Sequence, residues 1–161
     1  MGDTAHSIGD ALRRQAGRDP GVIRTERDGV NIEVDVEASE RYASGVRGVT
    51  VRPAQPAPSV RDVAEQIVER VDALEPLAIV ECDDAQGRAI VRSAEPEHST
   101  DGVRYWEADV QPDGTSLHRY HKQHDQPDRE QIVEPLLHPV VGRVAEQLAD
   151  AVKKCQVSSN D

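Results

Sequence analysis

Two neighbouring stretches of the chain hold side chains that could carry out acid–base chemistry. One is YWEAD at residues 105–109, and the other is LHRYH at residues 117–121. An aspartate hydrogen-bonded to a histidine, with a glutamate and a tyrosine beside them, supplies the groups of a general acid–base site. The candidate catalytic residues are therefore Asp109, His118, Glu107 and Tyr120.

These side chains meet only if the two stretches pair as a hairpin. The segment Pro112–Gly114 predicts one, with residues 113 and 114 forming a two-residue loop. Asp109 then lies opposite His118, about 5 Å away at Cβ, and the other two candidates also face each other. The same register places four residues on the other face, toward the expected core: Trp106, Ala108, Val110 and Leu117. A one-residue slip at Pro112 would exchange the two faces.

The same polar face also has a simpler interpretation, as a solvated sheet face whose charges were selected for pairing and solubility. No nucleophile or oxyanion donor accompanies the Asp–His pair. The sequence also lacks a glycine-rich phosphate loop and the HExxH, GxSxG and CxxC motifs. These observations favour a non-catalytic role and leave an enzyme as the alternative.

A second group of polar residues, at the end of the same stretch, has the side-chain types of a metal site. His118 and His121 point to opposite faces if both lie on one strand. His121, His124 and Asp125 could converge if the chain leaves the sheet after His121, and they are the candidate metal ligands. Zinc sites usually have three or four ligands, and both cysteines lie far away in the sequence. The alternative is a loop of exposed histidines, and we expect no cofactor.

Hydrophobic periodicity predicts the elements that must position these residues. Residues 30–37 alternate apolar and acidic or amide side chains, which is typical of a strand with one buried face. Residues 59–74 repeat apolar residues at helical spacing after the capping residue Ser59. The predicted strands span 22–25, 30–37, 46–52, 77–80, 88–92, 102–110 and 115–121, and the predicted helices span 7–16, 59–74, 128–137 and 139–154.

This order predicts a single α+β domain over residues 1–155, followed by a polar tail at 156–161. The links between the strands after Pro76 are short, and short links require antiparallel pairing. The expected fold is an antiparallel sheet with helices packed on one face. It has a helix and three strands at 7–52, a proline-rich spacer at 53–58, and a unit with four strands between helices at 59–155.

Composition narrows the classes of partner. The chain has 161 residues and a net charge of -11, a negative field that disfavours nucleic acid and anionic membranes. We expect a soluble protein because no apolar run is long enough to span a membrane, and the first residues carry no signal-peptide pattern. Two cysteines make no disulfide framework, which favours the cytoplasm. The excess of arginine over lysine fits either a salty cytoplasm or GC-rich coding.

The functional expectation from the sequence is a non-catalytic module that binds a protein or a peptide. Aromatic residues make up only 2% of the chain, and so small a core would benefit from burial against a second copy, which favours a homodimer. The alternative is a site for a metal or a small ligand on the hairpin Tyr105–His121, enzymatic or merely binding.

Overall fold

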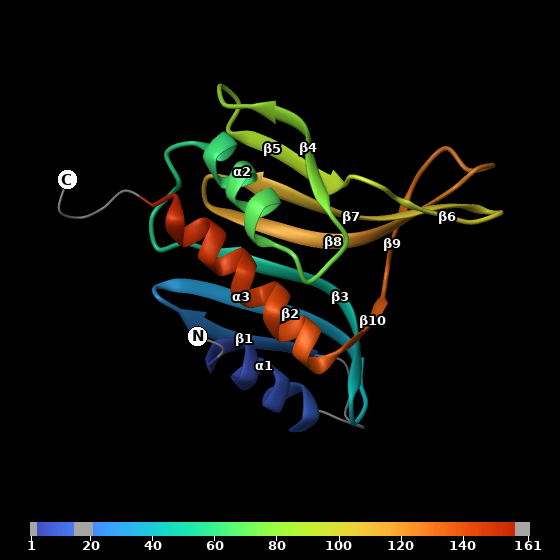
Figure 1. Cartoon of the computed structure of the whole chain (residues 1–161), viewed down its shortest axis with the longest axis horizontal. Helices are drawn as coiled ribbons and strands as arrows, with labels where there is room; N and C mark the ends of the chain where they lie inside the picture. Colours follow the sequence, from blue (N-terminus) through green and yellow to red (C-terminus); the bar gives the residue numbers. More distant parts are fainter. Residues whose placement is uncertain (1–2, 15–20, 157–161) are drawn as a thin grey trace.

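The computed structural model describes residues 3–14 and 21–156 and shows an α+β fold (Figure 1). The predicted class is therefore confirmed, although the antiparallel sheet is larger than expected, with ten strands instead of seven in the described residues. The helices are α1 (Asp3–Arg14), α2 (Val60–Arg70) and α3 (His138–Lys154). The strands are β1 (Gly21–Arg27), β2 (Val30–Ser39), β3 (Ala43–Arg52), β4 (Leu77–Asp83), β5 (Arg88–Ser93), β6 (Glu97–His98), β7 (Gly102–Gln111), β8 (Gly114–Gln123), β9 (Glu130–Ile132) and β10 (Glu134–Leu137).

The two predicted groups of strands form one continuous sheet. Its main path runs β1-β2-β3-β8-β7-β5-β4, with every neighbouring pair antiparallel. The connection between the groups is the pairing of residues 48–51 of β3 with residues 115–118 of β8. The polar hairpin β7–β8 therefore lies in the middle of the sheet and not at an edge.

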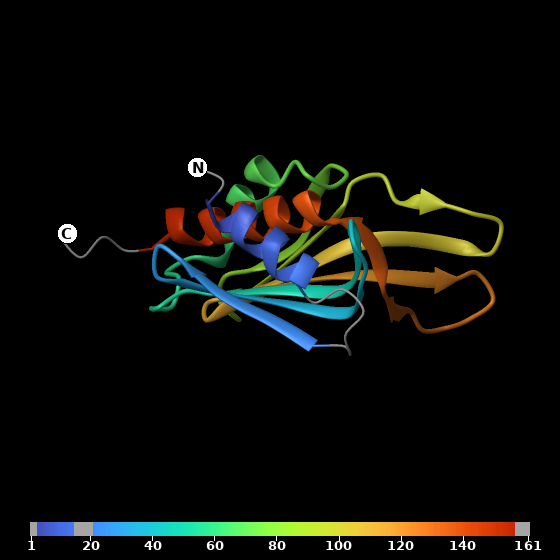
Figure 2. The same cartoon turned by 90° about the horizontal axis from the view of Figure 1, so that it is seen from below.

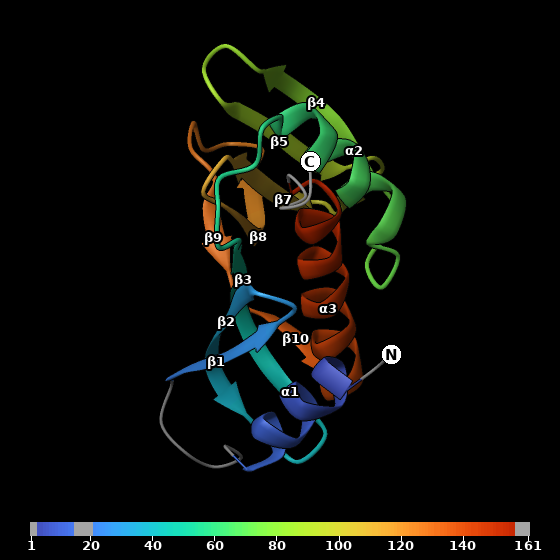
Figure 3. The same cartoon turned by 90° about the vertical axis from the view of Figure 1, so that its left-hand side faces the viewer.

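All three helices pack on one face of this sheet, as the side views show (Figures 2 and 3). The alternation along β2 turns its four aliphatic side chains, at positions 30, 32, 34 and 36, toward the helices, where each is fully buried. Helices α1 and α3 approach closely at Gly142, because a Cβ there would lie 2.3 Å from the carbonyl oxygen of Ala5. Arg27 joins β1 to α3 through a 2.8 Å hydrogen bond to Asp150. The opposite face, called the open face below, carries no helix from the described residues.

Helix α2 begins as predicted and ends earlier. The hydroxyl of Ser59 accepts a hydrogen bond from the backbone N–H of Asp62, which is the expected N-cap. The helix ends at Arg70, with Val71 in an extended conformation as the C-cap, and not at residue 74. Its buried side, which includes Val63 and Ile67, packs on the sheet.

The helix predicted over residues 128–137 is wrong, because this segment forms the short strands β9 and β10. Strands β3 and β8 pair over only four residues and then separate. β9 continues the ladder along β8, with Ile132 opposite Arg119, and β10 continues it along β3, with Glu134 opposite Val46. Pro135 also disfavours a helix interior because it has no N–H to donate.

Two further points complete the comparison with the predicted elements. The segment 93–101, between two predicted strands, contains the two-residue strand β6, which pairs with β7. Residues 15–16 of the first predicted helix and 157–161 of the predicted tail lie outside the described residues. Within the described part of the chain, no helix is long and apolar enough to cross a membrane.

Candidate functional site

The hairpin β7–β8 forms, but its register differs by two residues from the predicted one. The loop residues are Pro112 and Asp113, and Gly114 pairs with Gln111 in the ladder. Proline favours the second position of a turn, which moves the turn one residue back from the predicted glycine. Gly114 instead allows β8 to approach β3 closely, because a Cβ at this position would lie 3.0 Å from the carbonyl oxygen of Val51 on β3.

A shift of two residues keeps every side chain on its predicted face and changes its partner. Trp106, Ala108, Val110 and Leu117 are buried on the helix side, as predicted. On the open face, Glu107 lies opposite His118, and Asp109 lies opposite Ser116. The predicted cross-strand pair of Asp109 with His118 is therefore wrong.

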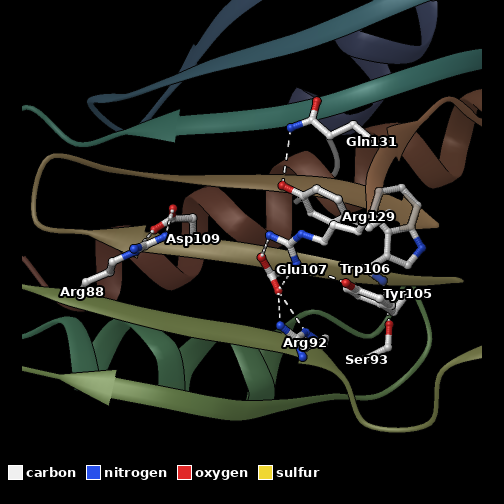
Figure 4. Close-up of polar contacts among 10 residues, drawn as sticks. Arg88, Arg92, Ser93, Tyr105, Trp106, Glu107, Asp109, Arg129 and Gln131 are labelled. Carbon is white, nitrogen blue, oxygen red and sulfur yellow. Dashed lines mark hydrogen bonds and ion pairs between the residues drawn. The ribbon is translucent and has the colours of Figure 1, made fainter. Parts of the chain in front are cut away.

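Asp109 instead forms an ion pair with an arginine of the neighbouring strand β5. The guanidinium of Arg88 donates to both carboxylate oxygens, at 3.3 and 3.1 Å (Figure 4). The hydrogen bond to Asp109 raises the pKa of Arg88 above its usual value. Both side chains are exposed enough for the pair to contribute little to stability.

Glu107 is the central acid of the open face. Its side chain is only 5% exposed and accepts hydrogen bonds from Arg92 at 2.7 and 2.9 Å and from Arg129 at 2.7 and 2.8 Å (Figure 4). Burial alone would raise the pKa of Glu107, but the hydrogen bonds from the two arginines outweigh it, and the pKa lies below its usual value. Glu107 is therefore a fixed anion at neutral pH.

Two tyrosines complete this cluster. The rings of Tyr105 and Tyr120 stack with their centroids 5.9 Å apart. The guanidinium of Arg92 lies 4.9 Å from the centroid of Tyr105, and that of Arg129 lies 3.8 Å from the centroid of Tyr120. Arg129 also donates to the hydroxyl of Tyr105 at 3.2 Å. We call these five residues, Arg92, Tyr105, Glu107, Tyr120 and Arg129, the platform.

His118 sits beside the platform on a glycine. A Cβ at Gly48, its partner on β3, would lie 2.5 Å from the imidazole, so the ring packs directly on the backbone. Gly48 in turn pairs with Asp35 on β2, which places His118 and Asp35 in one row across three strands. Burial lowers the pKa of His118, and the negative charges of Asp35, Asp109 and Glu107 partly oppose that effect.

A polar hollow of about 390 Å³ lies next to this row on the open face. Three of the four candidate catalytic residues line it, namely Asp109, His118 and Tyr120, together with Thr50, Arg52 and Ser116. The fourth, Glu107, is held between its two arginines. The structure thus gathers the candidates on one surface without pairing the histidine with the aspartate that the sequence suggested.

The candidate metal ligands do not converge. Strand β8 continues to Gln123, so the chain does not leave the sheet after His121 as a metal site would require. The imidazole of His121 is 7% exposed and lies 3.8 Å from both Asp101 and Glu130. His124 and Asp125 are exposed in the following turn. Among the described residues, no three histidine, cysteine or acidic side chains are placed to hold a metal ion.

Sequence reasoning missed the arginines of the platform. The position of Arg92 could have been predicted, because it lies on the same side of β5 as Arg88 and the predicted strand contained both residues. Arg129 precedes β9 in the segment that was predicted to be a helix, so its approach to Glu107 had no signal in the sequence.

Comparison with known proteins finds no matching family model, no similar curated protein and no similar solved structure. The geometry of the open face is therefore the basis on which a function for this chain is inferred.

Proposed function

We propose that this protein is a non-catalytic binding module that takes a protein or peptide partner on the open face of its sheet. The observation that carries the proposal is the platform, in which two stacked tyrosines and two arginines are held in place by a buried carboxylate. Tyrosine and arginine are enriched at the centres of protein interfaces. Arg92 and Arg129 keep 38% and 35% of their side-chain surface exposed, which leaves them accessible to a partner.

The state of the acidic groups supports binding over acid–base catalysis. A general acid or base needs a pKa near the working pH and freedom to exchange its proton. Glu107 has a lowered pKa and four hydrogen bonds from two arginines, and Asp109 is paired with Arg88. In these contacts the carboxylates hold arginine side chains in place and are not free to exchange protons.

Charge favours an acidic partner. At the centre of the open face, on β3, β8, β7 and β5 with Arg129 included, basic side chains outnumber acidic ones, while Glu33, Asp35 and Glu81 lie on the flanking strands β2 and β4. The basic residues are Arg52, Arg88, Arg92, Lys122 and Arg129, and the acidic residues are Glu107 and Asp109. We infer that the partner is a segment rich in carboxylates, with aromatic or apolar side chains that contact the tyrosines.

A selection from a random library of 12-residue peptides tests this function. We expect peptides enriched in aspartate, glutamate and aromatic residues, and we expect their binding to weaken about tenfold or more in Arg129→Gln, which loses one charge-assisted contact. Arg104→Gln is the matched control, because Arg104 is an exposed arginine of β7 on the other face. Peptides without acidic enrichment, or equal losses in both variants, would contradict the proposal.

Two other binding partners of the open face are also supported by observations. The polar hollow has the volume of a small-ligand site and holds His118, so a small polar ligand is the second candidate function. A second copy of the chain is the other, as expected for a small core that contains few aromatic residues. Light scattering on the wild type and on Arg129→Gln distinguishes the homodimer, because a dimer that uses the platform dissociates in the variant.

For the compartment we propose the reducing cytoplasm. The two cysteines, Cys82 and Cys155, are both free and half-buried. Free thiols are the usual state of cysteines in a reducing cytoplasm.

A further inference from the structure

A second pocket lies on the opposite side of the sheet, at the start of α3. Its volume is about 360 Å³, and its wall combines α1, the turn between β2 and β3, and the first turns of α3. Figure 1 shows α1 beside the first half of α3, where the two helices meet at Ala5 and Gly142. This pocket shares no residue with the platform or with the polar hollow.

The charges around this pocket are positive. Three arginines, Arg13, Arg41 and Arg143, line it with two histidines, His6 and His138. No aspartate or glutamate lines it within residues 3–14 and 21–156, although the whole chain has 30 acidic residues. An anion entering the pocket would therefore meet a favourable local field in an otherwise acidic protein.

One of these arginines lacks a carboxylate partner. Arg13 pairs with Asp10, and Arg143 lies 3.1 Å from Asp72. Arg41 forms no ion pair with a carboxylate of the described residues, and its guanidinium lies 5.2 Å from the ring centroid of Tyr42. Arg41 is thus the cation that a ligand can use without breaking an existing pair.

His138 provides the independent indication of a ligand. Its side chain lines the pocket and is 4% exposed, and its Nε2 has no hydrogen-bond partner among the described residues. The backbone of Ala43 favours the protonated form of this ring, and Nε2 is the ring nitrogen that is buried without a partner. A buried nitrogen without a partner costs free energy that a bound ligand would recover.

The first turn of α3 adds a further donor. The N-cap residue Leu137 makes no side-chain capping bond, and no acidic residue lies in the first turn. The N–H of His138 donates to the carbonyl of Tyr42, and Pro139 has no N–H. The amide of Val140, the third helical residue, has no acceptor within the helix, and the start of α3, which lines the pocket through His138 and Pro139, carries a partial positive charge.

The remaining wall is apolar and has room for a ligand. This apolar part of the wall is formed by Ala5, Gly9 and Pro139, and a Cβ added at Gly9 would meet nothing within 4 Å. We propose that this pocket binds a small organic carboxylate, with its charge toward Arg41, His138 and the start of α3 and its apolar body over Gly9. This site is independent of the proposed function on the open face.

Binding also takes up a proton. The protonated ring of His138 can donate from Nε2 and also carries a charge that attracts a carboxylate, and burial lowers the pKa of this ring in the free protein. The charged and titratable groups that line the pocket with it are His6 and Arg13 from α1, Arg41 and Tyr42 from the turn, and Arg143 from α3, and Asp10 of α1 contacts both His6 and Arg13. A bound carboxylate adds a negative charge directly beside the ring, so the pKa of His138 rises and binding is tighter at pH 6 than at pH 8.

Titration with sodium benzoate, followed by NMR of the full chain, tests this site. We expect saturable shifts of the His138, Val140 and Gly9 resonances, a raised pKa of His138, and no comparable shifts with benzamide, the neutral analogue. Arg41→Gln should weaken benzoate about tenfold or more. Gly9→Leu should abolish binding while the protein stays folded, because the new side chain enters empty space.

Arg70→Gln is the matched control, since Arg70 is an exposed arginine of α2, away from this pocket, that donates a hydrogen bond to Gln66. It should bind benzoate like the wild type. Equal binding of benzoate and benzamide, unchanged binding in Gly9→Leu, or shifts with inorganic phosphate but not with benzoate would each overturn the proposal.

Discussion

At the scale of single residues, the open face depends on one tight packing contact and one buried carboxylate. His118 packs on the bare backbone of Gly48, so the row from His118 to Asp35 depends on a missing Cβ. Glu107 depends on two arginines that come from β5 and from the segment before β9. Both contacts can be tested by single substitutions.

Gly48→Ala should lower the free energy of unfolding by about 1–3 kcal/mol, because the new Cβ would lie 2.5 Å from the imidazole of His118 and 3.0 Å from the carbonyl oxygen of Leu117. Urea denaturation measures this loss. Gly9→Ala is the matched control, with open space around the added Cβ, and it should raise the free energy of unfolding by about 0.5–1 kcal/mol. Similar effects at the two glycines would contradict this packing.

Glu107→Gln should lower the free energy of unfolding by about 1–3 kcal/mol at pH 7, because Arg92 and Arg129 lose their shared counter-charge. The partial exposure of both arginines keeps the loss below that of a fully buried pair. The pKa of Glu107 is lowered in the folded protein, so its stabilisation is present above the pKa of the unfolded chain and disappears as the pH falls through the folded pKa.

Denaturation at pH 7 and at pH 3 checks both statements for Glu107. The wild type and Glu107→Gln should differ at pH 7 and converge toward pH 3. Asp109→Asn removes a charge from a more exposed pair on the same strand and should change the stability at pH 7 by well under 1 kcal/mol. An equal effect of the two substitutions would show that the buried contacts of Glu107 stabilise the protein no more than the exposed pair of Asp109 does.

At the scale of elements, the segment β9–β10 shows where prediction from local sequence pattern fails. Strands with strict alternation, such as β2, and the capped helix α2 follow from local pattern, and the structure has both. The residues before α3 have no such pattern, and their strands exist because β3 and β8 diverge and leave a gap between them. The structure of this segment is determined by pairing with strands that are distant in the sequence, and no local sequence pattern indicates that pairing.

The same distinction applies to the candidate site. The faces of β7 and β8 were predictable, because side-chain alternation is insensitive to a shift of two residues. The pairing of Asp109 with His118 was not, because it depended on which residues occupy the turn. Arg129 reaches Glu107 only through the segment before β9, so the platform required the three-dimensional fold.

Helix α3 provides a prediction at this scale, because its N-cap is Leu137, a residue with no capping group and with 58% of its surface exposed. Leu137→Ser should raise the free energy of unfolding by about 1 kcal/mol, since the hydroxyl can accept from a free amide of the first turn. Thermal unfolding measures the gain. Leu137→Ala, which removes the same exposed surface without adding an acceptor, should show no gain, and equal behaviour of the two variants would exclude capping.

At the scale of the whole molecule, two effects of pH act in opposite directions. The net charge of -11 at pH 7 falls toward zero near the pI of about 4.9, which relieves repulsion and stabilises the fold. Two histidines on opposite sides of the sheet, His118 and His138, have pKa values lowered by burial. Salt separates these effects because it screens repulsion between exposed charges and leaves burial unchanged.

In 1 M NaCl, we therefore expect the free energy of unfolding to fall as the pH drops from 7.5 to 5.5. Both histidines have a lower pKa folded than unfolded, so below about 6.5 the unfolded chain takes up protons that the folded chain does not, and protonation favours unfolding. The slope is at most about 1.4 kcal/mol per pH unit for each histidine. Urea denaturation across this range measures it.

Substitution assigns the slope to these two histidines. The double variant His118→Gln with His138→Gln should flatten the dependence, because neither glutamine titrates. His124→Gln should leave it unchanged, since His124 is exposed in the turn after β8. A slope that survives in the double variant would have to come from other groups. A free energy of unfolding that rises toward pH 5.5 even in high salt would mean that relief of repulsion exceeds the cost of protonating these two imidazoles.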